Sequence, residues 1–115
     1  MLNYTSGQIV LVDLGSPPNE VKGHEQAKKR PCLVIKHFSH LSLLTIIPIT
    51  SKKQKYNPYS IVDLPKDTGN LKFDSYALCH QIRTISEDRI IDVVGTIDKH
   101  SLLRVKSVVV DIFDF

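Results

Sequence analysis

The chain has 115 residues and a mass of 13.0 kDa, the size of a single domain. Its hydrophobic content of 42% allows a core without disulfides or metals, and its 23% of charged residues excludes strong disorder. The net charge of +3 favours an anionic partner without proving one. The N-terminus lacks a signal-peptide pattern, and no window approaches about eighteen consecutive apolar residues. We therefore expect one cytoplasmic domain over residues 1–115, with no membrane segment.

The first half of the chain predicts three strands, at residues 8–13, 31–37 and 41–49, with a turn near residues 38–40. Pro48 cannot donate to a ladder and should lie at a strand end or a bulge. The polar stretch 15–29 (GSPPNEVKGHEQAKK) is too long for a hairpin turn and has the length typical of a functional loop. We expect it to act as a lid.

The second half begins with a basic loop, residues 51–58, and a fourth strand, residues 59–64. A turn cluster at 65–70 precedes a fifth strand of alternating character, which we expect over residues 74–84. Ser86 should cap a helical turn, and residues 90–97 form a last strand. Asp98 has the character of a helix N-cap, which predicts a terminal helix over residues 99–112. Its many valines favour a final strand as the competing interpretation. Short, closely spaced strands with one terminal helix indicate a mainly β, small barrel.

The two cysteines, Cys32 and Cys79, both lie in apolar runs. One disulfide between them is an alternative, but buried free thiols in a reducing compartment are the expected state.

Four segments, in chain order, resemble the MazF/PemK family of toxins. GHEQAKKRPCLVI at residues 23–35 is similar to the signature G-x-E-Q-x-x-x-R-P-x-x-V-[IV]. GQIVLVDL at 7–14 resembles the opening strand, IPIT at 47–50 the strand end that carries a Thr or Ser, and QIRTI at 81–85 the segment Q-[IV]-[RK]-[ST]-I. The chain differs in the SPPNEVK insertion in its first loop, and in His24 and His80, where small and acidic residues are more usual.

The resemblance implies an SH3-like small barrel (CcdB/PemK-like fold) with a C-terminal α-helix. It further implies a homodimeric, Kid-like toxin endoribonuclease of a type II toxin–antitoxin system. Such a toxin cleaves single-stranded RNA (mRNA) sequence-selectively, needs no metal or other cofactor, and is inhibited by a cognate MazE/PemI-like antitoxin. Contact with operator DNA is expected only through the antitoxin.

Metal-free cleavage uses the RNA 2′-hydroxyl as nucleophile, and its phosphorane transition state carries extra negative charge. Arg30 suits this charge, because its planar fork binds two phosphate oxygens and stays charged. Pro31 favours an extended Arg30 at the mouth of a strand, although a surface arginine ending a basic run is the alternative. By family position, Thr50 would donate its hydroxyl to the phosphate; the alternative is a strand-ending Thr that starts a turn.

Further candidates for contacts with substrate are Glu25, Gln26, Ser51, Lys52, Lys53, Gln81 and Arg83. Solvated loop positions, and a structural ion pair for Arg83, are the alternatives. His24 and His80 are candidate members of an acid–base pair, although no spacing brings them together. The Cys and His spacings do not match a zinc site, and we expect no metal ligand.

Two other functions remain open on sequence grounds. A non-catalytic toxin of the same barrel that binds DNA gyrase should lack the E-Q-x-x-x-R-P segment, which is present here. An inactive SH3-like nucleic-acid-binding module would bind RNA without cleaving it.

Overall fold

The computed structural model describes residues 3–15, 29–53 and 58–114. These residues form seven antiparallel strands and one helix. The strands are β1 (Gln8–Asp13), β2 (Lys29–Phe38), β3 (Leu43–Thr50), β4 (Ile61–Leu64), β5 (Ser75–Leu78), β6 (Arg83–Ser86) and β7 (Ile90–Thr96), and the helix is α1 (Lys99–Phe113). Short 3-10 turns lie between them: η1 (Ser39–Leu41), η2 (Pro58–Ser60), η3 (Thr68–Asn70), η4 (Cys79–Gln81) and η5 (Glu87–Arg89).

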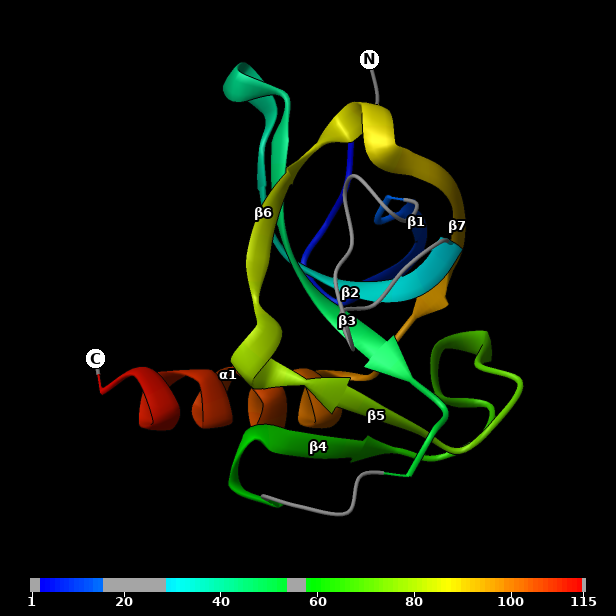
Figure 1. Cartoon of the computed structure of the whole chain (residues 1–115), viewed down its shortest axis with the longest axis vertical. Helices are drawn as coiled ribbons and strands as arrows, with labels where there is room; N and C mark the ends of the chain where they lie inside the picture. Colours follow the sequence, from blue (N-terminus) through cyan, green and yellow to red (C-terminus); the bar gives the residue numbers. More distant parts are fainter. Residues whose placement is uncertain (1–2, 16–28, 54–57, 115) are drawn as a thin grey trace.

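The strands close into a barrel-like ring. The sheet order is β4-β5-β3-β2-β1-β7, and β6 also pairs with β3. Because β6 and β7 are consecutive in the chain but pair with β3 and β1, the connection through η5 arches over the β1–β3 layer (Figure 1). The predicted mainly β fold with a C-terminal helix is confirmed.

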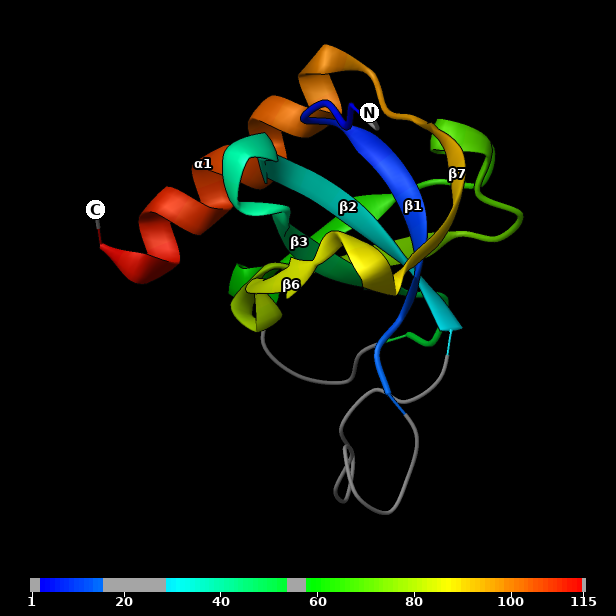
Figure 2. The same cartoon turned by 90° about the horizontal axis from the view of Figure 1, so that it is seen from above.

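Two apolar clusters fill the two sides of this layer. One contains Ile9, Leu33 and Ile47 and extends to α1, where Val105 is fully buried. The other contains Val10, Val34 and Ile46 inside the ring. The alternation follows from the two-residue period of a strand. Helix α1 covers the first cluster and contacts β4, η2 and η4, as its position beside the sheet shows (Figure 2).

Both predicted caps are confirmed. The Asp98 carboxylate accepts from the backbone N–H of Ser101 at 3.0 Å, and α1 begins at the next residue. The Ser86 hydroxyl accepts from the backbone N–H of Asp88, and η5 begins at Glu87. The competing final strand is therefore wrong: a good N-cap and burial of one helical face outweigh the poor helix propensity of the valines.

The prediction of one strand over residues 74–84 is wrong. Ile46 pairs with Arg83 and Ile49 with Ala77, so five residues (78–82) lie opposite two (47 and 48). The extra residues form η4 opposite Pro48, which has no N–H to donate to a ladder. Gln81 consequently lies in η4 and not on a strand. The strand predicted at 41–49 also begins later, because Leu41 belongs to η1.

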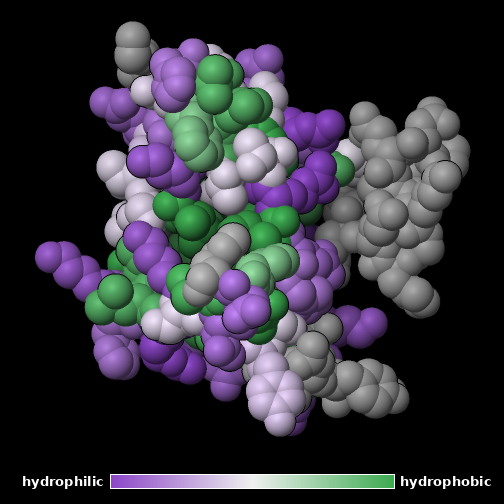
Figure 3. Space-filling view, turned by 90° about the vertical axis from the view of Figure 1, so that its left-hand side faces the viewer, coloured by the Kyte–Doolittle hydropathy of each residue, from purple (hydrophilic) through white to green (hydrophobic). Residues whose placement is uncertain are grey.

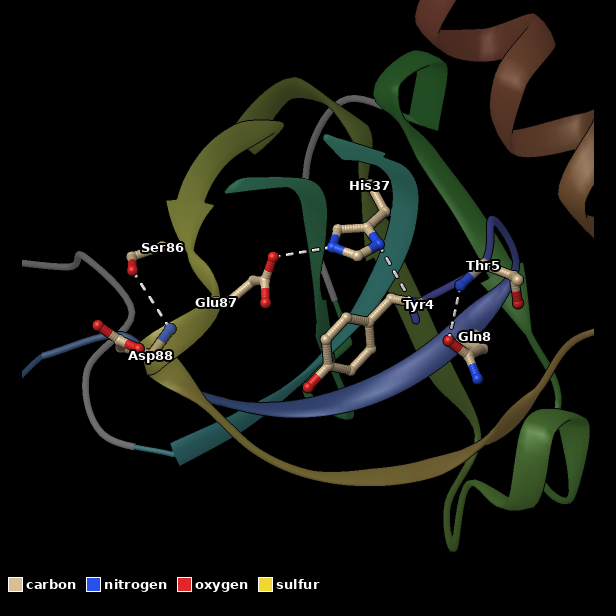
Figure 4. Close-up of polar contacts among 7 residues, drawn as sticks. All are labelled: Tyr4, Thr5, Gln8, His37, Ser86, Glu87 and Asp88. Carbon is tan, nitrogen blue, oxygen red and sulfur yellow. Dashed lines mark hydrogen bonds and ion pairs between the residues drawn. The ribbon is translucent and has the colours of Figure 1, made fainter. Parts of the chain in front are cut away.

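The N-terminal segment is held by polar contacts of His37 and Gln8. His37 Nδ1 accepts from the backbone N–H of Tyr4 at 3.2 Å, and the two rings meet edge to face (Figure 4). His37 Nε2 bonds Glu87, at the start of η5. Gln8 accepts from the backbone N–H of Thr5 at 2.8 Å. These contacts tie the chain before β1 to β2 and η5.

Cys32 and Cys79 are buried free thiols, as expected. Burial raises the pKa of Cys32 to about 12 and that of Cys79 to about 11. Such thiols are chemically inert near neutral pH.

Apolar side chains also reach the surface on the face that carries the end of α1 (Figure 3). Val110 and Phe113 of α1 and Leu41 of η1 are among the exposed large apolar residues. Within the described part of the chain, no helix is long and apolar enough to cross a membrane.

Candidate active site

A cavity of about 780 Å³ opens where β2 and β3 separate. The last pair in this ladder is Cys32 with Pro48, and beyond it β3 pairs with β5 while β2 continues beside β1. The tip of β3, the beginning of β2 and the segment before β5 meet at this point (Figure 1). The cavity is lined by Leu11, Lys29, Arg30, Pro31, Ile49, Thr50, Ser51, Lys52, Asn70, Leu71, Lys72, Phe73, Ser75 and Val94.

Arg30 and Thr50 border this cavity from the two separating strands. Each lies two residues beyond the Cys32–Pro48 pair, one on β2 and the other on β3. Because side chains on a strand alternate, both continue the row that faces the cluster inside the ring. The tertiary structure thus brings together two residues that sequence reasoning could only name separately.

The Arg30 guanidinium is half-buried and incompletely paired. Its Nε is buried and has no hydrogen-bond partner within the described ranges. Burial lowers the pKa of Arg30 below its ordinary value, and the neighbouring Cys32 raises it in part. A guanidinium nevertheless stays charged near neutral pH. An anion in the cavity would supply the acceptor that the buried Nε lacks.

Arg83 lies on the same side of the sheet as Arg30. Its neighbour two residues on, Ile85, belongs to the cluster inside the ring, as does Cys32. The positive charges of Arg30 and Arg83 both lower the pKa of the Cys32 thiol, against the larger effect of burial. Arg83 is exposed and does not line the cavity.

The Thr50 hydroxyl is buried and oriented by the turn that follows β3. Its side chain is 6% exposed, and Oγ1 accepts from the backbone N–H of Lys52 at 3.1 Å. Since this bond uses a lone pair, the hydroxyl keeps its own hydrogen to donate. The site can therefore offer a neutral donor beside the cation of Arg30.

The cavity lining is strongly basic. Lys29, Arg30, Lys52 and Lys72 contribute to it, and the described lining contains no carboxylate. Four cations around one concave surface attract a polyanion and raise its local concentration. Charge and shape together suit a phosphodiester chain.

Of the other predicted site residues, some line the cavity, some lie outside it, and some are not among the described residues. Ser51 and Lys52 line the cavity, whereas Lys53 is exposed beside it. Gln81 is exposed in η4 and outside the lining. His80 is also outside, and its Nδ1 lies 2.8 Å from the Ser60 hydroxyl. His24, Glu25 and Gln26, with most of the predicted lid, lie outside the described residues.

Sequence reasoning missed the wall formed by residues 70–73 and Val94. The only local signal was a basic residue next to an aromatic one, Lys72–Phe73, after a turn. Over residues 3–15, 29–53 and 58–114, no group of three or more His, Cys, Asp or Glu side chains could hold a metal.

A family model described as "PemK-like, MazF-like toxin of type II toxin-antitoxin system" matches residues 5–113. The chain belongs to this family. The toxin is 27% identical over 106 residues to Endoribonuclease MazF9 of Mycobacterium tuberculosis, covering 85% of this chain and 86% of that protein. The family assignment made from the four sequence segments is confirmed.

Solved structures share the toxin's fold. MazF from Deinococcus radiodurans superposes with a TM-score of 0.78 at 20% identity, and the match covers 100% of both chains. An endoribonuclease solved in complex with its cognate antitoxin, from a mycobacterial species, gives a TM-score of 0.73 at 13% identity. That match covers 98% of this chain and 97% of the other.

Proposed function

We propose that this toxin is an endoribonuclease that cleaves single-stranded RNA, with mRNA as its cellular substrate. The observation that carries the proposal is the cavity between β2 and β3, where the half-buried Arg30 guanidinium and the buried Thr50 meet a described lining that is basic and without carboxylates. The name of the relative in Mycobacterium tuberculosis supports the same activity.

In the proposed reaction, the 2′-hydroxyl attacks the adjacent phosphorus and the bond to the 5′-oxygen breaks. The products are a 2′,3′-cyclic phosphate and a 5′-hydroxyl. The Arg30 fork binds the non-bridging oxygens, on which charge grows as the phosphorane forms. Thr50 donates to the same phosphate, and Lys29, Lys52 and Lys72 hold the neighbouring phosphates. Lys53 and Ser51 would extend this track along the turn after β3.

Stabilising the phosphorane charge and moving the protons are separate tasks in this reaction. Arg30 stabilises charge, and its pKa, though lowered by burial, keeps it cationic. Glu25 and Gln26 would order the first loop or hydrogen-bond a base edge of the substrate. A pair of His24 and His80 is the alternative acid–base arrangement, and it predicts a bell-shaped rate profile with large losses in His24→Ala and His80→Ala. Gln81 and Arg83 would then contact RNA beyond the cavity.

The deciding experiment incubates the wild-type protein with a long RNA in EDTA and maps both ends of each fragment. We expect site-selective cuts that leave cyclic phosphate and 5′-hydroxyl ends. Arg30→Ala should abolish them, whereas Arg104→Ala, an exposed arginine on α1, should not. No cleavage by wild type, or equal cleavage by Arg30→Ala, would overturn the proposal. RNA binding without cleavage would point to the inactive binding module, and inhibition of DNA gyrase to the gyrase-binding toxin.

The proposal includes the partners expected of such a toxin. We propose a homodimer that a cognate MazE/PemI-like antitoxin inhibits, with operator DNA contacted only through that antitoxin. The Deinococcus radiodurans relative was solved as a MazE–MazF complex. We also propose that the protein is cytoplasmic, which its two buried free thiols support. Size-exclusion chromatography with light scattering tests the dimer.

A further inference from the structure

Residues 70–73 form part of the wall of the cavity that Arg30 also lines, and their backbone is held by hydrogen bonds. Leu71 is buried in the cluster beneath α1, and its carbonyl accepts from the backbone N–H of Asp67 at 2.8 Å. The Asp74 carboxylate accepts from the backbone N–H of Lys66, and the Ser75 hydroxyl donates to the carbonyl of Phe73, both at 2.8 Å. Local hydrogen bonds therefore fix both ends of the segment before β5.

Two glycines allow this wall to approach β7 closely. A Cβ on Gly95 would lie 2.7 Å from the carbonyl carbon of Gly69 and 3.0 Å from Asn70 Nδ2. Gly69 itself has a φ of +54°, and a Cβ there would lie 2.6 Å from the Cδ1 of Ile9. The contact between η3 and β7 thus exists because neither residue has a side chain. The wall is positioned by packing, before any ligand binds.

Phe73 is the unusual residue of this wall. Its side chain is 66% exposed, and among the described residues it is the only large exposed apolar side chain that also lines the cavity. It makes no contribution to either core cluster. An aromatic ring held on a rigid backbone, next to Lys72 and in the cavity that Arg30 lines, presents a π face where a base of a bound strand would lie.

Asn70 adds a directional group beside the ring. It has a φ of +65°, and its Nδ2 donates to the carbonyl of Val94 at 3.0 Å. Because a carbonyl can only accept, this bond fixes which arm of the amide is nitrogen. The Oδ1 on the other arm is an acceptor of defined direction, able to take an N–H from the edge of a base.

We infer that residues 70–73 form a base-recognition wall: Phe73 stacks on a base next to the phosphate held by Arg30, and Asn70 Oδ1 accepts from that base's edge. Lys72 pairs with the phosphate of the same nucleotide. This inference rests on the proposed function and deepens it, because it names residues that set the preference for sequence. Stacking on a side chain requires an unpaired base, which restricts the substrate to single strands.

The first test measures binding to a pool of 2′-O-methyl RNA oligonucleotides, which lack the nucleophile and cannot be cut. We expect Phe73→Ala to weaken binding about tenfold, within the range for loss of one stacked base. Phe73→Trp should remain within about twofold of wild type, and Phe73→Leu, apolar but without a π face, should behave like Phe73→Ala. The matched control is Leu103→Ala, an equally exposed apolar side chain on α1 (63%).

The second test maps cleavage sites on a random RNA pool by sequencing. We expect Asn70→Ala to relax the base preference at one position of the motif and leave the others unchanged, with a loss of about fivefold at the preferred base. Asn70→Asp keeps the acceptor and should retain more of the preference. Urea denaturation of each variant confirms that it is folded, and the Trp–Leu comparison at position 73 decides the matter if Phe73→Ala is unstable.

The outcomes separate this inference from the proposed function. If the wild-type protein cleaves RNA but the Phe73 variants bind as wild type does and the Asn70 variants keep the cleavage motif, the inference is overturned and the ribonuclease proposal stands. Phe73-dependent binding without any cleavage would overturn the ribonuclease proposal and leave the stacking wall standing. Equal weakening by Phe73→Leu and Phe73→Trp would assign Phe73 a structural role and overturn the inference.

Discussion

His37 Nε2 lies 2.9 Å from Glu87 Oε2, although fifty residues separate the two in the chain. The His37 side chain is 6% exposed, and its other nitrogen accepts from the backbone of Tyr4 (Figure 4). A neutral imidazole is thereby satisfied at both nitrogens, one as acceptor and the other as donor. One side chain joins the N-terminal segment, β2 and the turn that closes the ring.

Glu87→Ala should destabilise the fold, because it leaves the buried Nε2–H of His37 without an acceptor. We expect a loss of about 1–3 kcal/mol in the free energy of unfolding. Asp88→Ala, the exposed neighbour, should change it by about 0.5 kcal/mol or less. Urea denaturation measures both, and equal stability of the two variants would contradict the role given to the His37–Glu87 contact.

Thr50→Val should lower the rate of RNA cleavage while preserving the shape of the side chain. Its hydroxyl would no longer donate to the phosphate, and we expect a loss of about tenfold or more in kcat. The control is Thr45→Val. The Thr45 hydroxyl lies 2.8 Å from the Thr84 hydroxyl, and Thr45 does not line the cavity. If both variants cleave at the wild-type rate, Thr50 has no part in the reaction.

Lys72→Ala should weaken RNA binding to a similar degree for all sequences and make it less sensitive to salt. Removing one phosphate contact reduces the slope of log K against log salt by about 0.7 for a single strand. Lys106→Ala on α1 removes the same charge outside the cavity and should leave the slope unchanged. Titrations at several salt concentrations with uncleavable RNA provide the slopes, and identical slopes for the two variants would speak against Lys72.

The stability of the fold should decline at alkaline pH because of its buried thiols. Cys32 and Cys79 have pKa values of about 12 and about 11 in the folded state, against 9.0 for an ordinary thiol. Above pH 9 the unfolded chain therefore binds fewer protons than the folded one, and each thiol contributes a decline of up to about 1.4 kcal/mol per pH unit. Below pH 9 this contribution to stability is fully present.

Urea denaturation of wild type and Cys32→Ala at a series of pH values tests this linkage. The variant should be less stable at neutral pH but should decline less steeply above pH 9. Tyr4, whose pKa is raised by burial and then by Glu87, adds to the decline only near and above pH 10. Parallel curves for the two proteins between pH 9 and 10 would rule out the thiol explanation.

Gly95→Ala should move η3 away from β7 and damage both fold and site. The added Cβ would collide with the Gly69 carbonyl group, and such overpacking lowers the free energy of unfolding by about 1–3 kcal/mol. Thr96→Ala at the exposed next position should be nearly neutral. Urea denaturation gives the stability change, and an RNA cleavage assay of both variants in buffer without urea shows whether the site is damaged. Wild-type stability of Gly95→Ala would contradict the close packing of this wall.

Much of the local structure could be predicted from the sequence. Short-range signals predicted the strand at 8–13, the caps at Ser86 and Asp98, and the helix after Asp98. In the caps a side chain bonds to backbone N–H groups two or three residues away, and in the strand and the helix the period of the apolar residues shows which face is buried. Arg30 and Thr50 were predicted as site residues from the family resemblance and the phosphate chemistry.

Other features depended on residues that meet only in the folded chain. The break at η4 required Pro48 to lie opposite it on another strand, and the wall at 70–73 required the contact of Gly69 with Gly95. The cavity exists because β3 leaves β2 after Pro48 and pairs with β5. Sequence by itself determined most of the elements, their caps and the chemistry of Arg30. Tertiary structure alone decided which side chains share the cavity, because ladder pairing and close packing join segments that have no local signal for one another.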